Sequence, residues 1–522
     1  MIADALTAER IGLDWLRAAV APLGAFGRAV DETLAPYGPG DEDAARAEIA
    51  EVVACAQLMD DEGVMRARAA LRAVPEASPI VARARVGDPL ADVDFYELGR
   101  FIDGLDALAR AWDAAGGDAG RRPPLLDGLR ALLAPGRAGG GFYLDDAFGA
   151  GLRDARAALA AAEAAYDARR EEIAALVRDA IGVDPVGEEF VVLRDAYDGA
   201  LPDVVRVVRE TPTYRVVVPA IVIPERDAAF ARLAEEEEAA RRTLAERIAR
   251  EADAVRATTR ALGALDRLLA RVAFAQRWGG CVPTFASDRI ACVDATFAPL
   301  ADALGARAHP YTPISFDLRG VTVLTGPNMG GKTAALAAAG FACACAALGV
   351  APPAREATLP LLDAIAWVGG DVAADRTRLL SSYAAEILRA RDVLRAASPR
   401  SLVLVDEFAR TTGPREGRAL LVAFAEALHA SGAFALIATH FDGVAAASGA
   451  AHLRIAGLRE RLPATADGER LDAVLDAIAA AMDYRVVAAV EGSTDSDALA
   501  LAELLGLPDA LVARARTLHE AG

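Results

Sequence analysis

The stretch VTVLTGPNMGGKTAAL, Val321 to Leu336, decides the fold predicted for the carboxyl-terminal part of the chain. It opens with the apolar pattern of a short buried strand, passes through a glycine-rich turn and closes in an alanine-rich run with helical propensity. The turn has the spacing G-x-x-x-x-G-K-T, in which backbone N–H groups and a helix N-terminus surround phosphate oxygens. The sequence therefore predicts a phosphate-binding loop, formed by Gly326, Pro327, Asn328, Met329, Gly330 and Gly331.

Lys332 directly follows this loop and is the only lysine of the chain, although Lys and Arg together number 56. An ammonium is a compact charge on a flexible stem, whereas a guanidinium is planar and forked. We expect Lys332 to reach the β- and γ-phosphates of ATP and Thr333 to place its hydroxyl on Mg²⁺. A glycine-rich turn ahead of an ordinary helix is the alternative, and the strand–loop–helix context disfavours it.

Two further apolar strands end in polar residues. The stretch SLVLVDEFAR, residues 401–410, ends a strand in Asp406 and Glu407. Buried carboxylates are costly unless they serve a cation or a network, so we expect Asp406 to hold Mg²⁺ and Glu407 to orient or activate the attacking water. The stretch LIATHFDG, residues 436–443, presents His440, which we expect to sense the γ-phosphate; a polar cap of the strand is the alternative.

Length and composition indicate a globular chain of roughly two to four domains. The five cysteines form no C-x-x-C pair, and no secretory leader or membrane-spanning apolar run is visible, which predicts a reducing, cytoplasmic location. The net charge is −19 and arginines are interleaved with acidic residues throughout. Because nucleic-acid binders usually carry a basic patch, this charge pattern disfavours DNA as a partner without excluding it.

The predicted secondary structure changes along the chain. Residues 1–90 indicate a helical N-terminal region, and residues 91–285 indicate long helices with a small β insertion near residues 189–223. A stripe of apolar residues from Leu244 to Val272 predicts an amphipathic helix that acts as a lever or a static spacer, with Gly263 as a potential kink. From residue 286 to residue 522, strands alternate with helices, which predicts a largely parallel sheet in an α/β domain with a helical tail.

The motifs together resemble the MutS family of ATPases. The carriers are GPNMGGKT in the loop, SSYAAEI (residues 381–387), the Asp-Glu strand, ATHF (residues 438–441) and the tail over residues 483–515. The resemblance is strong over about residues 315–516 and weaker over residues 90–290. It implies a multidomain chain in which a helical core and lever helices precede an ABC-like P-loop ATPase domain, and a homodimer whose ATP sites form across the interface.

Two features depart from the family pattern. The family segment G-R-G-T-S-T-x-(D/E)-G reads ARTTGPREG here, residues 409–417, so that Gly413 replaces the serine facing the partner's ATP and leaves Thr411 or Thr412 as substitutes. About 90 residues precede the region that resembles the family core, so we expect no mismatch-reading domain in this sequence. The stretch DFYEL, residues 94–98, copies the F-x-E motif of that domain, but the spacing of Phe95, Leu98 and Phe101 predicts a buried helical face with Asp94 and Glu97 in a capping box.

The sequence leaves the target of the ATPase open between two main hypotheses. Short MutS-like reactivase subunits of cobalamin-dependent lysine and ornithine aminomutases have a similar size and an A-R-T-T-x-P-x-E-G segment. That resemblance implies remodelling of a partner enzyme, with a small accessory subunit and an aminomutase target. The alternative is a DNA-binding homologue related to mismatch repair or branched DNA. A scaffold that binds ATP without hydrolysis is a third possibility, disfavoured by the intact Lys332, Asp406 and Glu407.

Overall fold

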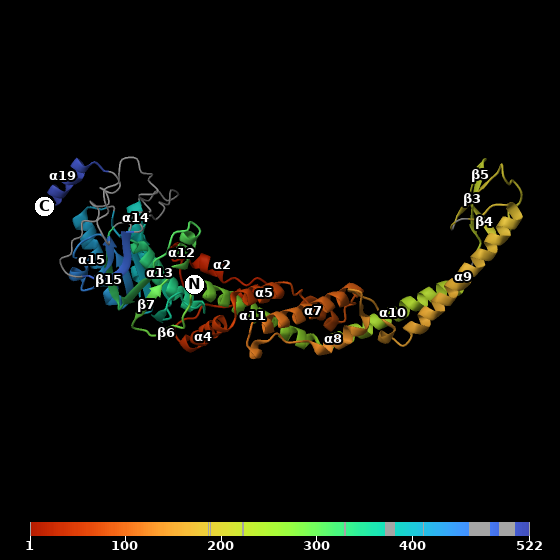
Figure 1. Cartoon of the computed structure of the whole chain (residues 1–522), viewed down its shortest axis with the longest axis horizontal. Helices are drawn as coiled ribbons and strands as arrows, with labels where there is room; N and C mark the ends of the chain where they lie inside the picture. Colours follow the sequence, from red (N-terminus) through yellow and green to blue (C-terminus); the bar gives the residue numbers. More distant parts are fainter. Residues whose placement is uncertain are drawn as a thin grey trace. The chain divides into compact units, whose positions relative to one another are not determined.

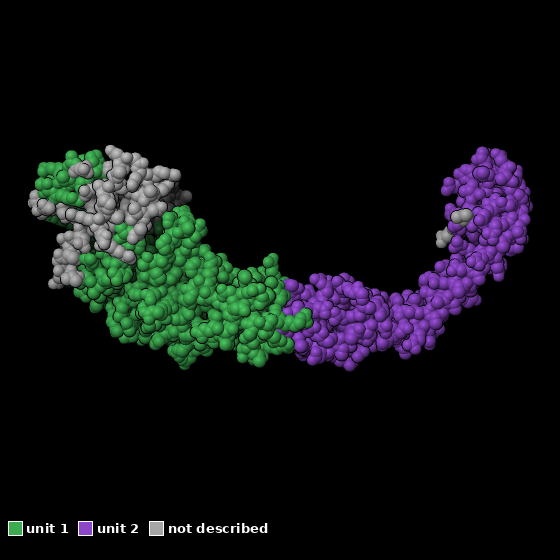
Figure 2. All heavy atoms as spheres, in the orientation of Figure 1, with its two compact units in different colours: residues 1–72, 110–122, 262–522 green, residues 73–109, 123–261 purple. Residues whose placement is uncertain are grey.

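The computed structural model describes residues 2–185, 187, 189–221, 224–327, 330–370, 382–410, 412–458, 481–489 and 507–520 (Figure 1). The chain forms two compact units (Figure 2). The first contains residues 1–72, 110–122 and 262–522, and the second contains residues 73–109 and 123–261. Within the described ranges, no helix combines the length and the apolar composition that a membrane crossing requires.

A six-stranded sheet in the order β11-β12-β13-β9-β14-β15 is the centre of the first unit. Its first five strands are parallel, and β15 pairs antiparallel with β14. The predicted strands around residues 321, 401 and 433 are confirmed as central members of this sheet. The strands are β9 (Val321–Thr325), β11 (Ala364–Gly369), β12 (Ser401–Asp406), β13 (Phe434–Ala438), β14 (Ala451–Leu458) and β15 (Met482–Ala488).

Helices cover both faces of this sheet, as expected for parallel strands. Successive side chains point to opposite faces: Leu402 and Leu404 join the core beneath α13, whereas Val403 and Val405 join the core beneath α14 and α15. Figure 1 shows α13 against the sheet. The helices of this layer are α13 (Lys332–Ala347), α14 (Ser382–Ala396), α15 (Pro414–Ser431) and α16 (Val444–Ser448), and α19 (Asp509–Glu520) follows β15.

The first unit also contains a smaller sheet, in the order β6-β10-β7-β8, and the N-terminal helices. Ile11 lies against the alanine-rich helix α13, where a Cβ on Gly340 would come within 2.6 Å of its Cγ2 atom. The strands are β6 (Thr284–Phe285), β7 (Ile290–Ala295), β8 (Ile314–Leu318) and β10 (Glu356–Leu359). The helices are α1 (Ala5–Arg10), α2 (Leu13–Ala19), α3 (Ala25–Asp31), α4 (Glu42–Leu58), α5 (Asp61–Arg72) and α12 (Ala298–Gly305).

The predicted lever stripe forms two helices, α10 (Pro224–Arg250) and α11 (Ala252–Trp278), which separate at Glu251. Gly263, the predicted kink, lies inside α11, and the helical stretch is interrupted at Glu251 instead. A Cβ there would come within 2.8 Å of the Phe26 carbonyl oxygen, so the glycine allows α3 to approach closely. Asp266, one turn on, accepts a hydrogen bond of 2.7 Å from the backbone N–H of Gly24 at the start of α3.

In the second unit, the F-x-E sequence around Phe95 is confirmed as part of a buried helix face. Phe95, Leu98 and Phe101 are all 0% exposed on α7 (Asp92–Ala114). The predicted capping box is wrong in detail: Asp94 accepts from the backbone N–H of Ala91 and pairs with Arg83, while Glu97 pairs with Arg100. The remaining elements here are α6 (Ser78–Val86), α8 (Asp127–Leu133), β1 (Arg137–Ala138) and β2 (Gly141–Phe142).

The β insertion is a three-stranded antiparallel sheet between α9 (Leu152–Ile181) and α10. Its strands are β3 (Phe190–Leu193), β4 (Val205–Glu210) and β5 (Tyr214–Pro219), in the order β3-β5-β4. The sequence indicated β3 and β5 but not β4 (VRVVRE), where Val205 and Val207 share a face but the alternation breaks at Val208. Helices α9 and α10 pack along each other over the stretch that leads to this sheet (Figure 1).

Candidate nucleotide site

The predicted phosphate loop connects β9 to α13. Gly331 has φ +90°, a conformation that glycine adopts readily, and it precedes the helix without a side-chain cap. Gly331 provides no side-chain cap, so the N-cap residue itself does not occupy the first N–H groups of α13. Gly326 has φ +146°, and a Cβ there would lie 2.8 Å from the Cβ of Ile455. Asn328 and Met329 lie outside the described residues.

Lys332 is folded back over this loop and is 6% exposed. Its Nζ donates to the carbonyl oxygens of Gly326 at 2.8 Å and Pro327 at 3.1 Å. Burial lowers the pKa of Lys332, and the negative charges of Glu407 and Asp406 partly offset that shift. A small ammonium fits between two loop carbonyls, whereas a guanidinium needs a wider, planar space. This geometry explains why residue 332 is a lysine in a chain whose other long cationic side chains are all arginines.

Thr333 and Asp406 meet although they are 73 residues apart in sequence. The Thr333 hydroxyl donates to the two carboxylate oxygens of Asp406 at 3.2 and 3.1 Å. Asp406 is 7% exposed, and burial raises its pKa, as does the charge of Glu407, while the Thr333 hydrogen bond and nearby cations lower it. A hydroxyl and a carboxylate are hard oxygen ligands of the kind Mg²⁺ prefers. The pair therefore fits the predicted metal ligands.

Glu407 follows β12 in a left-handed conformation, with φ +51°. Its Oε1 lies 3.9 Å from Lys332 Nζ, and its backbone N–H donates to the Ala438 carbonyl at the end of β13. A positive φ in a residue with a Cβ is uncommon and clusters at functional sites. The neighbouring strand contributes Gly369, where a Cβ would come within 2.1 Å of the Asp406 carbonyl oxygen. The backbone thus holds both carboxylates at the carboxyl end of the sheet.

A cavity of about 840 Å³ opens beside these groups. Gly331, Lys332, Thr333 and Glu407 line one side, and residues of α1, α2 and α12 line the other. Its size is in the range of pockets that bind small molecules. Arg10 of α1 also lines this cavity, and its charge lowers the pKa of Asp406. Sequence reasoning missed Arg10, because it lies more than 300 residues from the loop and carries no motif.

His440 and Thr439 follow β13, the strand between β9 and β12 in the sheet. Thr439 is buried and fixes the turn, because its hydroxyl accepts from the Phe441 N–H at 3.0 Å. The His440 side chain is exposed and lies against the Phe441 ring, with centroids 4.4 Å apart. The predicted sensor therefore stands at the same sheet edge as Lys332 and Asp406.

The segment around Gly413 forms the turn before α15. Thr412 donates its hydroxyl to the Ala409 carbonyl at 2.8 Å, and Gly413 is the N-cap residue of α15. Thr411 lies outside the described residues. Glu386, from the stretch SSYAAEI, is 8% exposed and accepts from the Ala409 N–H at 3.3 Å. Sequence analysis quoted that stretch but did not assign this contact, which ties α14 to the segment after Glu407.

Comparison with known proteins agrees with this geometry. Residues 322–521 match the family described as MutS domain V. The chain is 33% identical over 296 residues to Endonuclease MutS2 of Thermus thermophilus, covering 56% of this chain and 36% of the relative. It is 34% identical over 212 residues to DNA mismatch repair protein MutS of Granulibacter bethesdensis, covering 40% of this chain and 23% of the relative.

A third relative, DNA mismatch repair protein MutS of Thermus aquaticus, is 35% identical over 200 residues, which cover 38% of this chain and 23% of that protein. The matched stretches thus span about a third or less of each of these relatives. The family match includes Lys332, Thr333, Asp406, Glu407 and His440, whereas the cavity residues of α1 and α2 lie outside it. The predicted relationship is confirmed for the carboxyl-terminal region, since residues 322–521 match MutS domain V.

Proposed function

We propose that this chain is a Mg²⁺-dependent ATPase that acts as a two-state switch. The observation that carries the proposal is the contact between Thr333 and the buried carboxylate of Asp406, beside Lys332. A buried carboxylate destabilises a fold unless its burial is offset, and the pKa of Asp406 remains raised despite the Thr333 hydroxyl and the charges of Arg10 and Lys332. A phosphate loop on one strand and an acidic strand end two strands away give such a carboxylate a use.

Each side chain then has a defined task. Lys332 and the first N–H groups of α13 would hold the β- and γ-phosphates. Thr333 and Asp406 would ligate Mg²⁺, which when bound neutralises charge on the phosphates. Glu407 would take the proton of the attacking water, and His440 would contact the γ-phosphate from the neighbouring strand. ATP shifts the switch only as far as its affinity for the two states differs.

Two variants test the ATPase. Glu407→Gln should bind ATP normally but hydrolyse it roughly 10²–10⁴-fold more slowly, because the general base is lost. Lys332→Ala should lose ATP binding itself. Both are measured on the full chain with Mg²⁺, by phosphate release and by titration with a fluorescent ATP analogue. Arg170→Ala, on the exposed surface of α9, is the control. Hydrolysis at the wild-type rate in Glu407→Gln would contradict the assignment.

The MutS resemblance also supports a homodimer with composite ATP sites. In that arrangement the segment at Thr412 and Gly413 of one subunit would complete the site of the other. The hydrolysis-deficient Glu407→Gln chain should then sediment as a dimer with Mg²⁺ and ATP. A Glu407→Gln chain that remains a monomer at saturating ATP would argue against this assembly.

For the target of the switch we propose a partner protein rather than DNA. The observation is the charge of the small sheet and its loops, residues 182–221. This segment contains four arginines and seven acidic residues, and such an acidic composition suits DNA phosphates poorly. The acidic residues are Asp184, Glu188, Glu189, Asp195, Asp198, Asp203 and Glu210. The segment ARTTGPREG extends the proposal to a cytoplasmic enzyme of the cobalamin-dependent aminomutase type, with a small accessory subunit.

A DNA target is the competing candidate, because the names of the relatives, endonuclease and mismatch repair protein, refer to DNA work. ATP hydrolysis separates the two. The rate is measured at fixed moderate salt with plain, mismatched and branched duplexes, and separately with a purified cobalamin-dependent aminomutase. Stimulation by DNA that falls as salt rises would replace the protein target with DNA. Stimulation by the enzyme alone supports the proposal.

A further inference from the structure

The small sheet β3-β5-β4 has one face that is covered and one that is not. Phe190, Val192 and Val217 form the covered face and pack with the end of α9. The helix contributes Ile173, Val177 and Ile181 to this core, and all three are buried. This is the ordinary arrangement, in which a sheet buries its apolar face against a helix.

The opposite surface, here called the outer face, is also largely apolar. Alternation along the strands places Val191 and Leu193 of β3 on it, beside their partners Val216 and Tyr214 of β5. Val191 is 50% exposed and Leu193 is 55% exposed. Solvent-facing sides of antiparallel sheets normally carry polar residues. An exposed aliphatic face of this kind marks a surface that another molecule covers.

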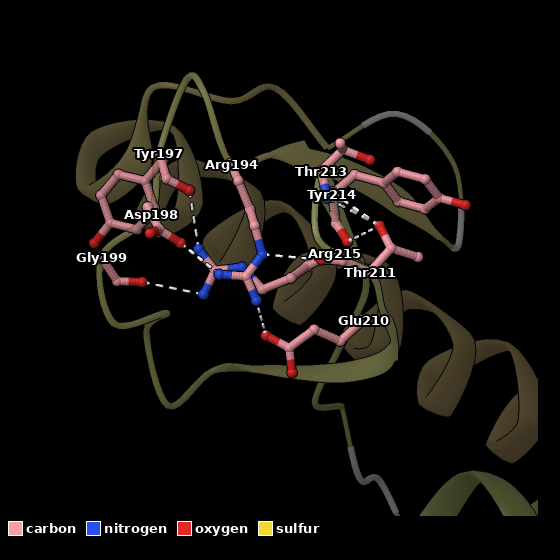
Figure 3. Close-up of polar contacts among 9 residues, drawn as sticks. All are labelled: Arg194, Tyr197, Asp198, Gly199, Glu210, Thr211, Thr213, Tyr214 and Arg215. Carbon is pink, nitrogen blue, oxygen red and sulfur yellow. Dashed lines mark hydrogen bonds and ion pairs between the residues drawn. The ribbon is translucent and has the colours of Figure 1, made fainter.

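The arginines of the sheet divide into two pairs with different tasks. Figure 3 shows that Arg194 and Arg215 hold the loops of the sheet. Arg194 pairs with Asp198 and Glu210 and donates to the Thr211 carbonyl. Arg215 is 8% exposed and donates to the carbonyls of Tyr197 at 2.9 Å and Gly199 at 3.1 Å. The guanidinium groups of Arg194 and Arg215 are thus already paired within the small sheet and its loops.

Arg206 and Arg209 of β4 form the other pair. They lie opposite Val218 and Val216 in the ladder, which places both on the outer face. Both side chains are exposed, and neither ion-pairs or hydrogen-bonds with another residue in the described part of the chain. Val208, between them at a register shift, is 48% exposed. The outer face therefore combines exposed aliphatic side chains on β3 with two positive charges on β4, on either side of Val216, which is 9% exposed.

We propose that the outer face docks an amphipathic helix of a partner protein, whose apolar stripe is flanked by carboxylates. This inference rests on the proposed protein target and names the surface that would bind it. The stripe would cover Val191, Leu193 and Val208, as α9 covers the opposite face. The carboxylates would pair with Arg206 and Arg209. A second copy of the same face would add two more guanidinium groups to the interface, so its charge is less complementary than that of an acidic helix.

The test uses the full chain without nucleotide and a synthetic helical peptide with leucines at i, i+3, i+4 and i+7 and flanking glutamates. Fluorescence anisotropy should show binding to the wild type. Leu193→Asp and the double change Arg206→Glu, Arg209→Glu should each weaken it by at least about tenfold. A peptide with lysines in place of the glutamates should prefer the double variant. Val86→Asp, at an exposed valine of α6, and Arg170→Glu are matched controls and should bind normally.

Basal ATP hydrolysis should be unchanged in all four variants, which separates failure of this surface from failure of the ATPase. Circular dichroism confirms that each variant is folded. A wild-type chain that binds neither peptide overturns the proposal, and so does equal affinity for the acidic and the basic peptide. Duplex DNA that binds the wild type but not the double variant would assign the face to nucleic acid. A wild-type dimer that Leu193→Asp dissociates would assign it to a second copy.

Discussion

The central sheet and the small sheet differ in how many of their faces are covered by helices. Helices cover both faces of the central sheet around β9, β12 and β13, and the site side chains Lys332, Asp406 and His440 lie just beyond or at the ends of these strands. The small sheet is covered on one face only, and Arg206 and Arg209, which have no ion-pair or hydrogen-bond partner among the described residues, lie on the other face within β4. A chemical site needs fixed groups at a strand end, whereas a docking site needs an open face.

The two sheets also differ in how their loops are fixed. Around Asp406 the chain accepts left-handed φ values at Glu407 and Ala409, and the adjacent strand supplies Gly369. In the small sheet, side chains instead of strained backbone fix the loops, through Arg194 and Arg215. The strongest substitutions should therefore act through the backbone in the central sheet and through side-chain packing in the small one.

The largest effect is expected from Gly369→Ala. The residue has φ +88°, and its new Cβ would meet the Asp406 carbonyl oxygen at 2.1 Å, so the strand end must shift. We expect unit 1 to lose about 3 kcal/mol or more. All four tryptophans (Trp15, Trp112, Trp278 and Trp367) lie in this unit, so their fluorescence in urea reports it. Gly413→Ala, where a Cβ meets nothing within 4 Å, is the control. Equal urea midpoints for the two variants would contradict the crowding described at Gly369.

A smaller effect is expected from Val217→Ala on the covered face of the small sheet. Val217 is 0% exposed, and losing its two methyl groups should cost about 2 kcal/mol of local stability. Val191→Ala, on the outer face, should change it by less than about 0.5 kcal/mol. Amide hydrogen exchange of β3, β4 and β5 measures this, because unit 2 contains no tryptophan. Faster exchange in Val191→Ala than in Val217→Ala would reverse the assignment of the two faces.

The smallest effect should be a gain in stability, from Asp406→Asn. Burial raises the pKa of Asp406 in the folded chain, so the fold favours its protonated form. The protonated carboxyl therefore contributes its full stability to the fold below the unfolded-state pKa of 3.8. This contribution is lost as the pH rises through the raised pKa of the folded chain. At neutral pH the nucleotide-free Asn variant should therefore melt about 2 °C higher while losing ATP hydrolysis.

The gain in Asp406→Asn should shrink as the pH approaches 4, because the wild-type carboxyl is then protonated as well. Thr333→Val is the comparison variant, since it removes the hydroxyl that stabilises the ionised carboxylate. It should lower the melting temperature at neutral pH. A loss of stability in Asp406→Asn at neutral pH would show that the carboxylate is satisfied without a cation.

The sequence predicted β9, β12 and β13 of the central sheet, because these strands are short apolar runs followed by rare residue types, but it did not indicate β11, β14 or β15. Glycines with fixed spacing, a single lysine and an Asp-Glu pair are local patterns, and the parallel sheet brings their strand ends together. The site residues could thus be named without knowing the topology. Glu386 and Arg10 could not be named from the sequence, because the packing of their helices brings them to the site.

The same limit applies to packing between helices and to the small sheet. Gly263 has the signature of a kink, yet it serves a close approach of α3 that only the three-dimensional contact reveals. Strand β4 is irregular in pattern because its ladder contains a register shift and its outer side chains are both aliphatic and charged. Alternation rules assume that a solvent-facing side is polar, and this strand breaks that assumption.

The solitary lysine has a practical consequence for labelling this protein. Within residues 1–522 the ε-amine of Lys332 is the only side-chain amine, and it lies inside the phosphate loop with a lowered pKa. Acylating reagents that enter the cavity therefore have one internal target, and bound nucleotide should shield it. The extent of acylation at Lys332, read by intact mass, becomes a direct measure of site occupancy without any engineered probe.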